Sequence, residues 1–590
     1  MKHYTYILIG VMLLFLASCQ DILDEQPRAI MTPDLFKTPA GLESGLTAAY
    51  NGLRYISGTE PTMCLSELGT DEFTSGGSGG SKQLDMTYEN GGSGITSSTS
   101  SINVPWNYIF PYINTCNGII EFGTEAGLSE SMIAEAYFLR AYYYFFLVQM
   151  YGGLPLDMGS GNLKFNTTPT TKSKRNTQEE VYQAIISDMK YATEHLPVSP
   201  RTKNNTVLVG CAFQATAIHY LAKIYLTHGD YQLALNEAEK LLNMASPYTK
   251  NSYGVALLPK YSDVITPGNE HSSEIMFTCE HTETYAFNET AAGFGSGELN
   301  KDDRSLSYFV PNYQSFSMPG GSGFLERTVE YSRPWIRFAP THGLLGTIFA
   351  DKTNDSRFYA SFQTVWRNNS TKTPNGMLGQ PIKANDTAFV ILPYEVSDAD
   401  LAALQATKNY KIWRLQDMSR DIFPSLKKFF DPNRADKNDA SGRPFLLAKL
   451  SETYLLAAEA ALALGDNTKA HDYVLTIRKR AAASADKVQA MIDATPATIT
   501  IDYILDERSR ELCGEQMRWF DLKRTGKWRD RATNYTIVET VKENGVDVKK
   551  VTIRTRDIKS HYDLRPIPDT QIALMGNNAQ EKKDYQNPDY

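Results

Sequence analysis

The sequence predicts a mostly α-helical protein, in which a tetratricopeptide-like helical scaffold carries a long, irregular, loop-rich insertion with short strands. A helix-turn-helix unit that occurs twice, together with helical periodicity in other segments, predicts the scaffold. Between about 250 and 440 this periodicity gives way to Gly, Ser, Asn, Thr and aromatic residues, which predicts the insertion. Because one helix pair cannot bury its apolar face alone, several pairs must stack.

The repeated unit covers residues 215–242 and 450–481. Each copy places small residues at helical spacing and then a Gly-Asp turn, Gly229-Asp230 in the first and Gly465-Asp466 in the second. Small residues let two helices cross closely, and glycine permits the tight turn between them. Further segments with helical periodicity are about 40–55, 105–122, 129–150, 177–196 and 500–518.

The N-terminus has the pattern of a cleaved signal peptide. Residues 6–16 form an apolar run that is too short to span a bilayer, which needs about 20 apolar residues. Leu16-Ala17-Ser18-Cys19 follows, and this site resembles the bacterial lipobox, in which the cysteine thiol is acylated. Two or more acyl chains anchor a protein firmly, so we expect a signal peptide at 1–18 and a lipidated surface tether at 19–35.

The composition excludes several classes of protein. Of the 590 residues, 42% are hydrophobic and 21% charged, as in a globular protein, and no other segment reaches membrane-spanning length. A net charge of −8 without a basic patch argues against nucleic-acid binding. Beyond Cys19, the cysteines are odd in number and scattered, which does not predict a disulfide framework; they are Cys64, Cys116, Cys211, Cys279 and Cys513.

Two short motifs suggest chemistry but lack its context. The segment 76–80 matches the G-x-S-x-G nucleophile elbow, yet it lies in low-complexity sequence, so Ser78 is not expected to be a nucleophile. Cys279, His281 and Glu283 would share one face of a strand and could bind zinc, but their spacing fits no compact site. We therefore predict no metal and no cofactor.

The segment 506–526 is dense in alternating charge. Arg508, Glu511, Glu515 and Arg518 stand at helical i,i+3 and i,i+4 offsets. Paired carboxylates could serve a glycosidase. However, each acid has an arginine within one turn, which favours a permanently ionised structural network over a general acid. Because no metalloprotease, P-loop or dinucleotide motif is present either, the sequence predicts no enzyme.

Four stretches resemble the SusD/RagB family of Bacteroidota outer-membrane lipoproteins. "EAYFLRAYYYFFLVQMYGGLPL" at 135–156 resembles its E-A-x-F-L-R-A-x-x-Y segment. "RSRELCGEQMRWFDLKRTG" is similar to its R-x-R-E-L-x-x-E-x-x-R-W-x-D-L-x-R-x-G helix. "LRPIPDTQI" and the final "QNPDY" resemble its P-I-P and Q-N-P-G-Y ending, with Asp589 in place of glycine.

The resemblance implies a non-enzymatic lipoprotein of the outer membrane. It would capture an oligosaccharide or other glycan and deliver it to a TonB-dependent (SusC-like) transporter, acting as the lid of that transporter. The acids after the lipidated cysteine, Asp21, Asp24 and Glu25, fit export to the cell exterior. Three alternatives stay open: the same role with peptide cargo, a surface glycosidase, or a tetratricopeptide scaffold that binds only protein.

The physics of delivery favours weak binding. A tether keeps the lid near its transporter without tight docking, because it gives a high effective concentration. Release is part of delivery, and a Kd of about 1 mM needs only about −4 kcal/mol. Aromatic rings offer flat surfaces to the apolar faces of sugars, and arginine forks take hydroxyls or carboxylates.

The chain is expected to divide into an N-terminal helical part at 36–250, the insertion at 251–440 and a C-terminal helical part at 441–590.

Long irregular insertions on a rigid scaffold commonly bind ligands, so we expect contacts from the loop at 71–104 and from 325–370. The candidate residues are Asp71, Tyr88, Tyr331, Trp335 and Trp366. Trp335 is the first choice, because 331–337 concentrates two large aromatics and two arginines; for each aromatic, packing in a core stays open. Trp106, Trp519 and Trp528 are assigned to the scaffold.

Overall fold

A computed structural model describes residues 33–80, 83–84, 86–89, 94–168, 173–282, 303–319, 321–543, 546–575 and 578–590. The predicted signal peptide and most of the tether, including Cys19 and the three acids that follow it, lie outside these residues, as does Glu283. Among the described residues, no helix combines the length and hydropathy needed to cross a bilayer.

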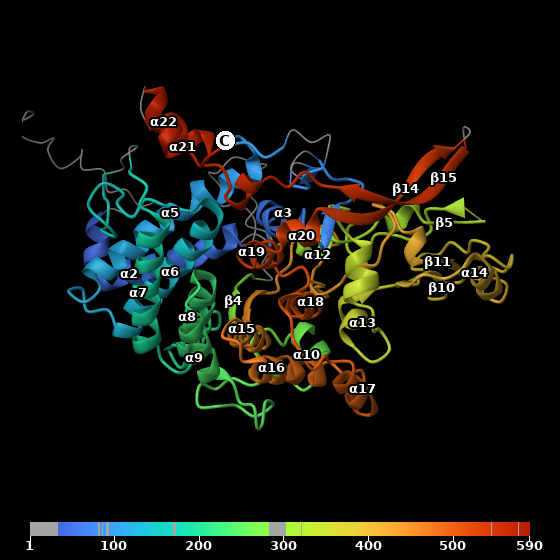
Figure 1. Cartoon of the computed structure of the whole chain (residues 1–590), viewed down its shortest axis with the longest axis horizontal. Coiled ribbons are helices and arrows are strands. Elements are labelled where there is room, and N and C mark those ends of the chain that lie inside the picture. The colour runs from blue at the N-terminus through green and yellow to red at the C-terminus, as the bar shows by residue number, and fades with distance from the viewer. Residues whose placement is uncertain are drawn as a thin grey trace, which may run out of the picture.

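A stack of helices forms the larger part of the molecule (Figure 1). Along the chain, α6 packs between α5 and α7, α7 packs on α8, and α8 on α9. After the insertion the chain returns to the same stack, where α15 packs against α9 and α8 and is followed by α16. Their bounds are α2 (Pro39–Asn51), α3 (Glu60–Glu67), α5 (Ser100–Phe122), α6 (Glu130–Tyr151), α7 (Gln178–His195), α8 (Gln214–His228), α9 (Tyr231–Leu241), α15 (Leu450–Ala463) and α16 (Asn467–Arg480).

The two repeat units fold as predicted, as α8–α9 and α15–α16. Gly229 and Gly465 end the first helix of each pair with φ of +102° and +81°, a left-handed conformation that other residues adopt only with strain. The small residues at the helix crossings, such as Ala222 and Ala457, are fully buried. The mostly α-helical, tetratricopeptide-like fold is therefore confirmed.

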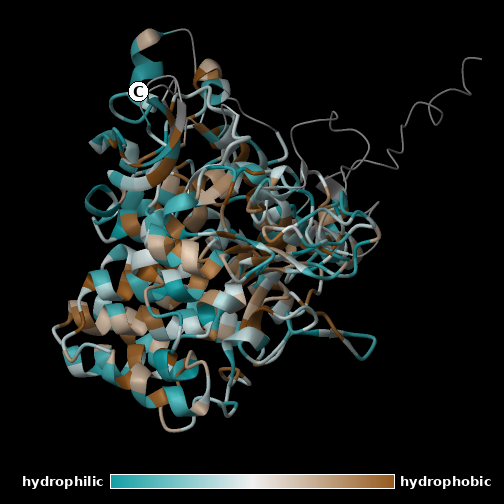
Figure 2. Ribbon diagram, turned by 90° about the vertical axis from the view of Figure 1, so that its right-hand side faces the viewer, coloured by the Kyte–Doolittle hydropathy of each residue, from teal (hydrophilic) through white to brown (hydrophobic). Residues whose placement is uncertain are grey.

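Apolar and polar residues alternate along the helices of the stack (Figure 2). The central helix α6 departs from this pattern, because most of its residues are buried on every side. A helix that is apolar all round belongs to a protein interior, and α6 is enclosed by α5, α7 and α8.

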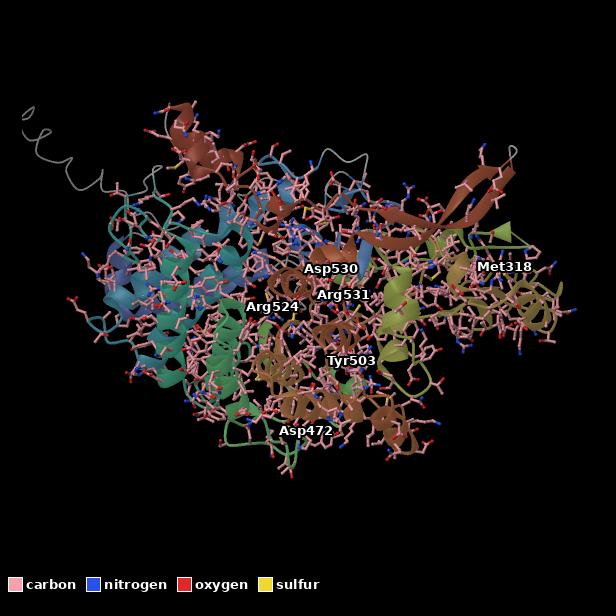
Figure 3. All side chains as sticks on the ribbon, viewed as in Figure 1. Met318, Asp472, Tyr503, Arg524, Asp530 and Arg531 are labelled. Atoms are coloured by element: carbon pink, nitrogen blue, oxygen red, sulfur yellow. The ribbon has the colours of Figure 1, made fainter. Side chains whose placement is uncertain are left out.

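The insertion lies beside the helical stack (Figure 1), and its buried apolar residues belong to the same core cluster as those of the stack. Strands β4 and β13 pair antiparallel and tie its two ends together at the stack. Within it, β9, β10 and β11 form a three-stranded sheet, and Trp366, Phe316 and Trp413 pack together on it. The predicted short strands are confirmed, and β5, which carries Met318, lies at the far end of the insertion (Figure 3).

The elements of the insertion and its flanks are short. Helices are α10 (Tyr261–Ile265), α12 (Ser305–Tyr308), α13 (Arg357–Ser361) and α14 (Asp398–Gln405), with a π-helical turn η4 at Gly343–Ile348. Strands are β4 (Ile275–Cys279), β5 (Ser317–Met318), β6 (Gly321–Ser322), β7 (Phe338–Pro340), β8 (Phe362–Gln363), β9 (Val365–Arg367), β10 (Thr387–Ile391), β11 (Lys411–Trp413), β12 (Ser425–Leu426) and β13 (Phe445–Lys449). Strands β1 (Phe73–Ser75), β2 (Thr202–Lys203) and β3 (Thr206–Val207) precede it.

The C-terminal part contains a long hairpin that the sequence analysis missed. Strands β14 and β15 pair in register from Asn534↔Thr555 to Glu543↔Val546, and the hairpin extends beyond the body (Figure 1). A signal was present, because both strands are rich in β-branched residues. The elements here are α17 (Val488–Asp493), α18 (Ile501–Leu512), α19 (Arg518–Arg524), α20 (Trp528–Ala532), β14 (Asn534–Glu543), β15 (Val546–Thr555), α21 (Asp569–Leu574) and α22 (Ala579–Tyr585).

The five cysteines of the described residues are free thiols, as the sequence predicts. Four are buried and Cys211 is half-buried. Cys116 lies in α5 as a small buried side chain, and its burial raises the pKa of its thiol to about 12.

Candidate ligand-binding site

The structure brings the two predicted loop regions together. Strand β1 pairs antiparallel with β7, with Phe73 opposite Pro340. Beyond the strands, the backbone N–H of Gly76 donates to the carbonyl of Arg337 at 2.9 Å, and that of Ser78 donates to the carbonyl of Ile336 at 3.3 Å. The segments 76–78 and 336–337 therefore form one continuous surface, although some 260 residues separate them in the sequence.

Trp335 is partly exposed on this surface. The guanidinium carbons of Arg304 and Arg337 lie 5.6 and 5.8 Å from the centre of its ring. At this distance a cation is attracted to the indole face. The ring of Tyr308 packs beside the indole at 5.5 Å, so one side of Trp335 is anchored in the core.

Arginine donors surround the indole. Arg337 pairs with Glu60 at 2.9 Å and donates to the carbonyl of Ser78, which holds the two loops together. Arg333 is exposed, and its hydrogen bond to Asn438 is long, at 3.4 Å. Arg333 thus has donors to offer to hydroxyls or carboxylates of a ligand.

The backbone that carries Trp335 is strained on both sides. Ser332 and Ile336 have φ of +56° and +53°, in the left-handed region. A β-branched residue such as isoleucine is an outlier there, and such strain costs about 1–3 kcal/mol and clusters at functional sites. No sequence pattern marks this turn, because neither residue is a glycine or asparagine.

Asp71 and Tyr88 have structural partners. Asp71 forms two hydrogen bonds with Arg518, at 2.7 and 2.6 Å, and one with Arg531 at 2.8 Å. Burial would raise the pKa of Asp71, but the two arginines outweigh it and lower the pKa to about 2. Tyr88 is buried, accepts a hydrogen bond from Arg565, and packs against Trp528.

Tyr331 and Trp366 are also buried. The hydroxyl of Tyr331 donates to the carbonyl of Arg367 at 3.1 Å and accepts from its N–H at 2.8 Å. Trp366 is 1% exposed in the core of the insertion. Of the four aromatic candidates, Trp335 is the one that is partly exposed and can serve as a platform. A ligand-binding role for the other candidates remains a prediction, and their burial or their pairing with arginines does not favour it. Trp106, Trp519 and Trp528 are buried in the scaffold, as expected.

The charged segment 506–526 forms a buried ionic network. Its helix ends earlier than predicted, since α18 stops at Leu512 and α19 starts at Arg518. Most partners come from other elements rather than from the predicted neighbours on the same helix, because α18 is enclosed. Arg508 pairs with Glu452 of α15 at 2.9 Å, and Glu515 pairs with Lys428 and Lys449 at 2.7 and 2.8 Å.

This network keeps Glu507 and Glu511 of α18 ionised. Burial would raise the pKa of Glu511, but Arg480 and Arg357 outweigh it and lower the pKa to about 2. The same balance lowers the pKa of Glu507. A glycosidase needs a carboxyl group of raised pKa in an open cleft, and this network supplies neither. Figure 3 labels Tyr503, Arg524 and Arg531 around it, on α18, α19 and α20.

Among the described residues, neither the possible zinc ligands Cys279 and His281 nor the G-x-S-x-G segment at 76–80 forms a metal-binding or catalytic site. The Sγ of Cys279 lies 3.9 Å from Nε2 of His281, and burial lowers the pKa of that imidazole to about 3. Glu280 instead pairs with His271 at 3.0 Å. In the part of the chain that the structure describes, no group of three or more His, Cys, Asp or Glu could hold a metal ion. Ser78 lies in a turn rather than between a strand and a helix.

Two family models match the chain. The model of the SusD family matches residues 307–590, and a model described as "Starch-binding associating with outer membrane" matches residues 21–226. Among curated proteins, SusD-like protein P2 of Formosa agariphila is 25% identical over 546 residues, which cover 89% of this chain and 91% of that protein. SusD-like protein P25 of the same organism is 24% identical over 555 residues, 88% of this chain and 89% of that protein.

Solved structures share the fold at low sequence identity. A laminarin-binding SusD-like protein has a TM-score of 0.63 and 20% identity, and the match covers 94% of this chain and all of that one. Surface glycan-binding protein A of Bacteroides thetaiotaomicron, in complex with laminarihexaose, has a TM-score of 0.58 and 19% identity, and covers 91% of this chain and 97% of that one. With the helical scaffold and the matches over both halves, the chain belongs to the SusD/RagB family.

Proposed function

We propose that this protein captures an oligosaccharide at the surface around Trp335 and delivers it to a TonB-dependent, SusC-like transporter as its lid. The observation that carries the proposal is the partly exposed indole on a strained turn, flanked by Arg333 and Arg337, where two loops meet. Solved proteins of the same fold are described as binding laminarin and as a complex with laminarihexaose, which supports a glycan as the cargo.

The proposed contacts suit a sugar that must be released. The exposed part of the indole supplies an apolar face for one sugar ring. Arg333 donates to hydroxyls, while Arg337 is held in place by Glu60. One aromatic platform with few hydrogen bonds gives weak binding, on the order of 1 mM, and weak binding permits transfer to the transporter.

Binding assays separate glycan from peptide cargo. Native protein is applied to arrays of glycans and of peptides, and the best ligand is then titrated against Trp335→Ala. We expect a glycan ligand whose affinity falls by about tenfold or more, or about 1.4 kcal/mol, at an unchanged melting temperature. Tyr359→Ala, an exposed tyrosine of α13, is the matched control and should bind normally. Retained binding with a lower melting temperature would assign Trp335 to the core, and ligands found only among peptides would make the cargo peptide.

The lid role is tested in membranes. A tagged protein purified in mild detergent should bring a TonB-dependent transporter with it, and the pair should retain glycan better than the protein alone. Purification without a transporter under conditions that preserve other membrane complexes would argue for a free binding protein.

The proposed tether is the acylated Cys19, with the protein facing the cell exterior. One matched family is described as associating with the outer membrane, which supports this location. Cys19→Ala should abolish acylation and release the protein from membranes that lack the transporter. Neutral replacements of Asp21, Asp24 and Glu25 should leave it acylated but protected from protease added to intact cells; equal cleavage of both forms would show that the acids are not the export signal.

The protein is proposed to bind without catalysis and without a cofactor. The paired carboxylates of α18 support this, since the arginines around Glu507 and Glu511 lower the pKa of both and keep them ionised. Incubation with the bound glycan should give no new reducing ends. Turnover that one carboxylate substitution abolishes would instead establish a glycosidase.

A further inference from the structure

A separate cavity of about 400 Å³ lies between α5, the segment 155–166 with Ser173, and α21. Helices α5 and α21 lie in another part of the fold than α12, whose Tyr308 packs beside Trp335 (Figure 1). The cavity falls within the size range of small-ligand sites in proteins. Its lining residues are Trp106, Asn107, Phe110, Pro111, Asn114, Pro155, Met158, Asn166, Ser173 and Gln571.

The lining contains no charged residue and is rich in side-chain amides. An amide both donates and accepts hydrogen bonds, which is also what a hydroxyl group does. An anionic or cationic ligand would find no partner of opposite charge among these residues. The cavity therefore selects an uncharged, polar ligand.

The amides are held in place by bonds between distant segments. Asn114 of α5 donates to the carbonyl of Asn166 at 2.8 Å and accepts from its N–H at 2.8 Å. On the other side, Thr570 hydrogen-bonds to Asn107 at 3.3 Å. Positioned amides of this kind bind a ligand without a large ordering cost.

Proline in α5 adds an acceptor at the cavity. Pro111 has no N–H, so the carbonyl of Asn107 lacks the donor that an α-helix normally supplies four residues later. Both residues line the cavity.

Aromatic and apolar side chains form the remaining wall. The rings of Trp106 and Phe110 pack edge to face, with centres 5.1 Å apart, and the indole N–H reaches Gln571 at 3.4 Å. Trp106 itself is almost fully buried, while Phe110 is half-buried and offers apolar surface next to the amides. Apolar faces bordered by hydroxyls are the pattern of a sugar ring.

We propose that this cavity is a second binding site, for a neutral saccharide of one or two rings. Hydroxyls of the saccharide would bond with Asn107 and Gln571, and its apolar face would lie on Phe110. The proposal goes beyond cargo capture at Trp335 and does not depend on it. Two contacts on one chain would lengthen the stay of a long glycan on the protein. Gln571 lies in the stretch that resembles the family's P-I-P ending, to which the sequence analysis gave no role.

The test uses ligand-detected NMR with four neutral disaccharides, maltose, cellobiose, laminaribiose and mannobiose, and with one acidic disaccharide that contains glucuronate. All measurements are made in a Trp335→Ala background, so that the first site does not contribute. Ser173→Trp fills the cavity, and Asn107→Ala removes an amide with little change in volume. Ser262→Trp, at an exposed serine of α10, is the control for added indole surface.

We expect at least one neutral disaccharide to bind, and Ser173→Trp and Asn107→Ala each to weaken it by about tenfold or more, while Ser262→Trp changes nothing. Melting curves show whether each variant is folded. If Ser173→Trp does not fold, the result for Asn107→Ala decides whether the cavity binds the saccharide. The proposal would be overturned if the acidic disaccharide bound as well as the neutral ones. It would also be overturned if Asn107→Ala weakened the binding of none of the disaccharides. If these tests fail while Trp335→Ala still weakens binding of the glycan ligand of the first site, the second site is refuted and the proposal for the first site stands.

Discussion

The helix α18 and the turn at 331–337 both contain arginines, but those of α18 are buried in ion pairs, whereas Arg333 of the turn is exposed. Around α18, arginines such as Arg508 are fully buried and each faces carboxylates within about hydrogen-bond distance. At the turn, Arg333 is exposed with one long hydrogen bond, and the indole of Trp335 is only partly covered.

The difference teaches that burial and pairing, not residue type, separate a structural charge from a binding group. A buried arginine costs several kcal/mol unless carboxylates compensate it, so its donors are already committed. An arginine at the surface keeps its hydration and can exchange water for a ligand. The strain at Ser332 and Ile336 agrees with a binding role, because strained backbone clusters at functional sites.

The largest expected effect comes from breaking the network at Asp71. Asp71→Ala leaves Arg518 and Arg531 without their shared carboxylate, and removal of one partner of a buried pair costs about 3–5 kcal/mol. Denaturant unfolding measures this loss. Asp530→Ala, at an exposed carboxylate of the neighbouring helix, should leave the midpoint unchanged. A stable Asp71→Ala protein that has lost its glycan would make Asp71 a ligand contact after all.

Two tryptophans provide a matched pair. Trp366→Phe leaves space in the core of the insertion and should cost about 2 kcal/mol without a direct effect on binding. Trp335→Phe should change stability little, since its ring is partly exposed, but should weaken binding because the platform is smaller. Melting temperature and ligand titration are measured on both. If Trp335→Phe and Trp366→Phe lost equal stability, Trp335 would be a core residue like Trp366 and not a binding platform.

The pH dependence of stability isolates the ion pair of Asp71. Its folded pKa of about 2 lies below the usual value near 3.8, so its contribution is complete above about pH 4 and is lost as the pH falls towards 2. That contribution amounts to about 2 kcal/mol. Unfolding free energies from pH 6 to pH 2 should therefore fall less steeply for Asp71→Asn than for the native protein. Parallel curves would show that Asp71 is not held ionised by the arginines.

The smallest effect is expected on the outer face of the hairpin. Ile553 is 70% exposed, so Ile553→Ser should change stability by no more than about 0.5 kcal/mol. Val538, at 1% exposure on the partner strand, is the matched position, and Val538→Ala should cost about 1–2 kcal/mol. If Ile553→Ser destabilises the protein as much as Val538→Ala, the hairpin packs against more of the body than this structure shows.

The sequence by itself determined the helical scaffold, because periodicity and the Gly-Asp turns are local signals for helices and for the turns between them. It also identified the ionic character of 506–526, since acids and arginines alternate there at helical spacing. It named Trp335 and the two loops that meet there. Only the tertiary structure showed that Tyr88, Tyr331 and Trp366 are buried and that Asp71 is paired with two arginines, because a single aromatic or acid in irregular sequence has no period that separates core from surface.

The tertiary structure also decided what depends on contacts between distant segments. The partners of Arg508 come from another helix, and the amide cavity joins α5 to α21, which is more than 400 residues away in the sequence. The left-handed Ile336 is held by the packing of two loops and has no residue signature. Such features depend on how the elements pack, and packing brings together residues whose separation along the chain carries no local signal.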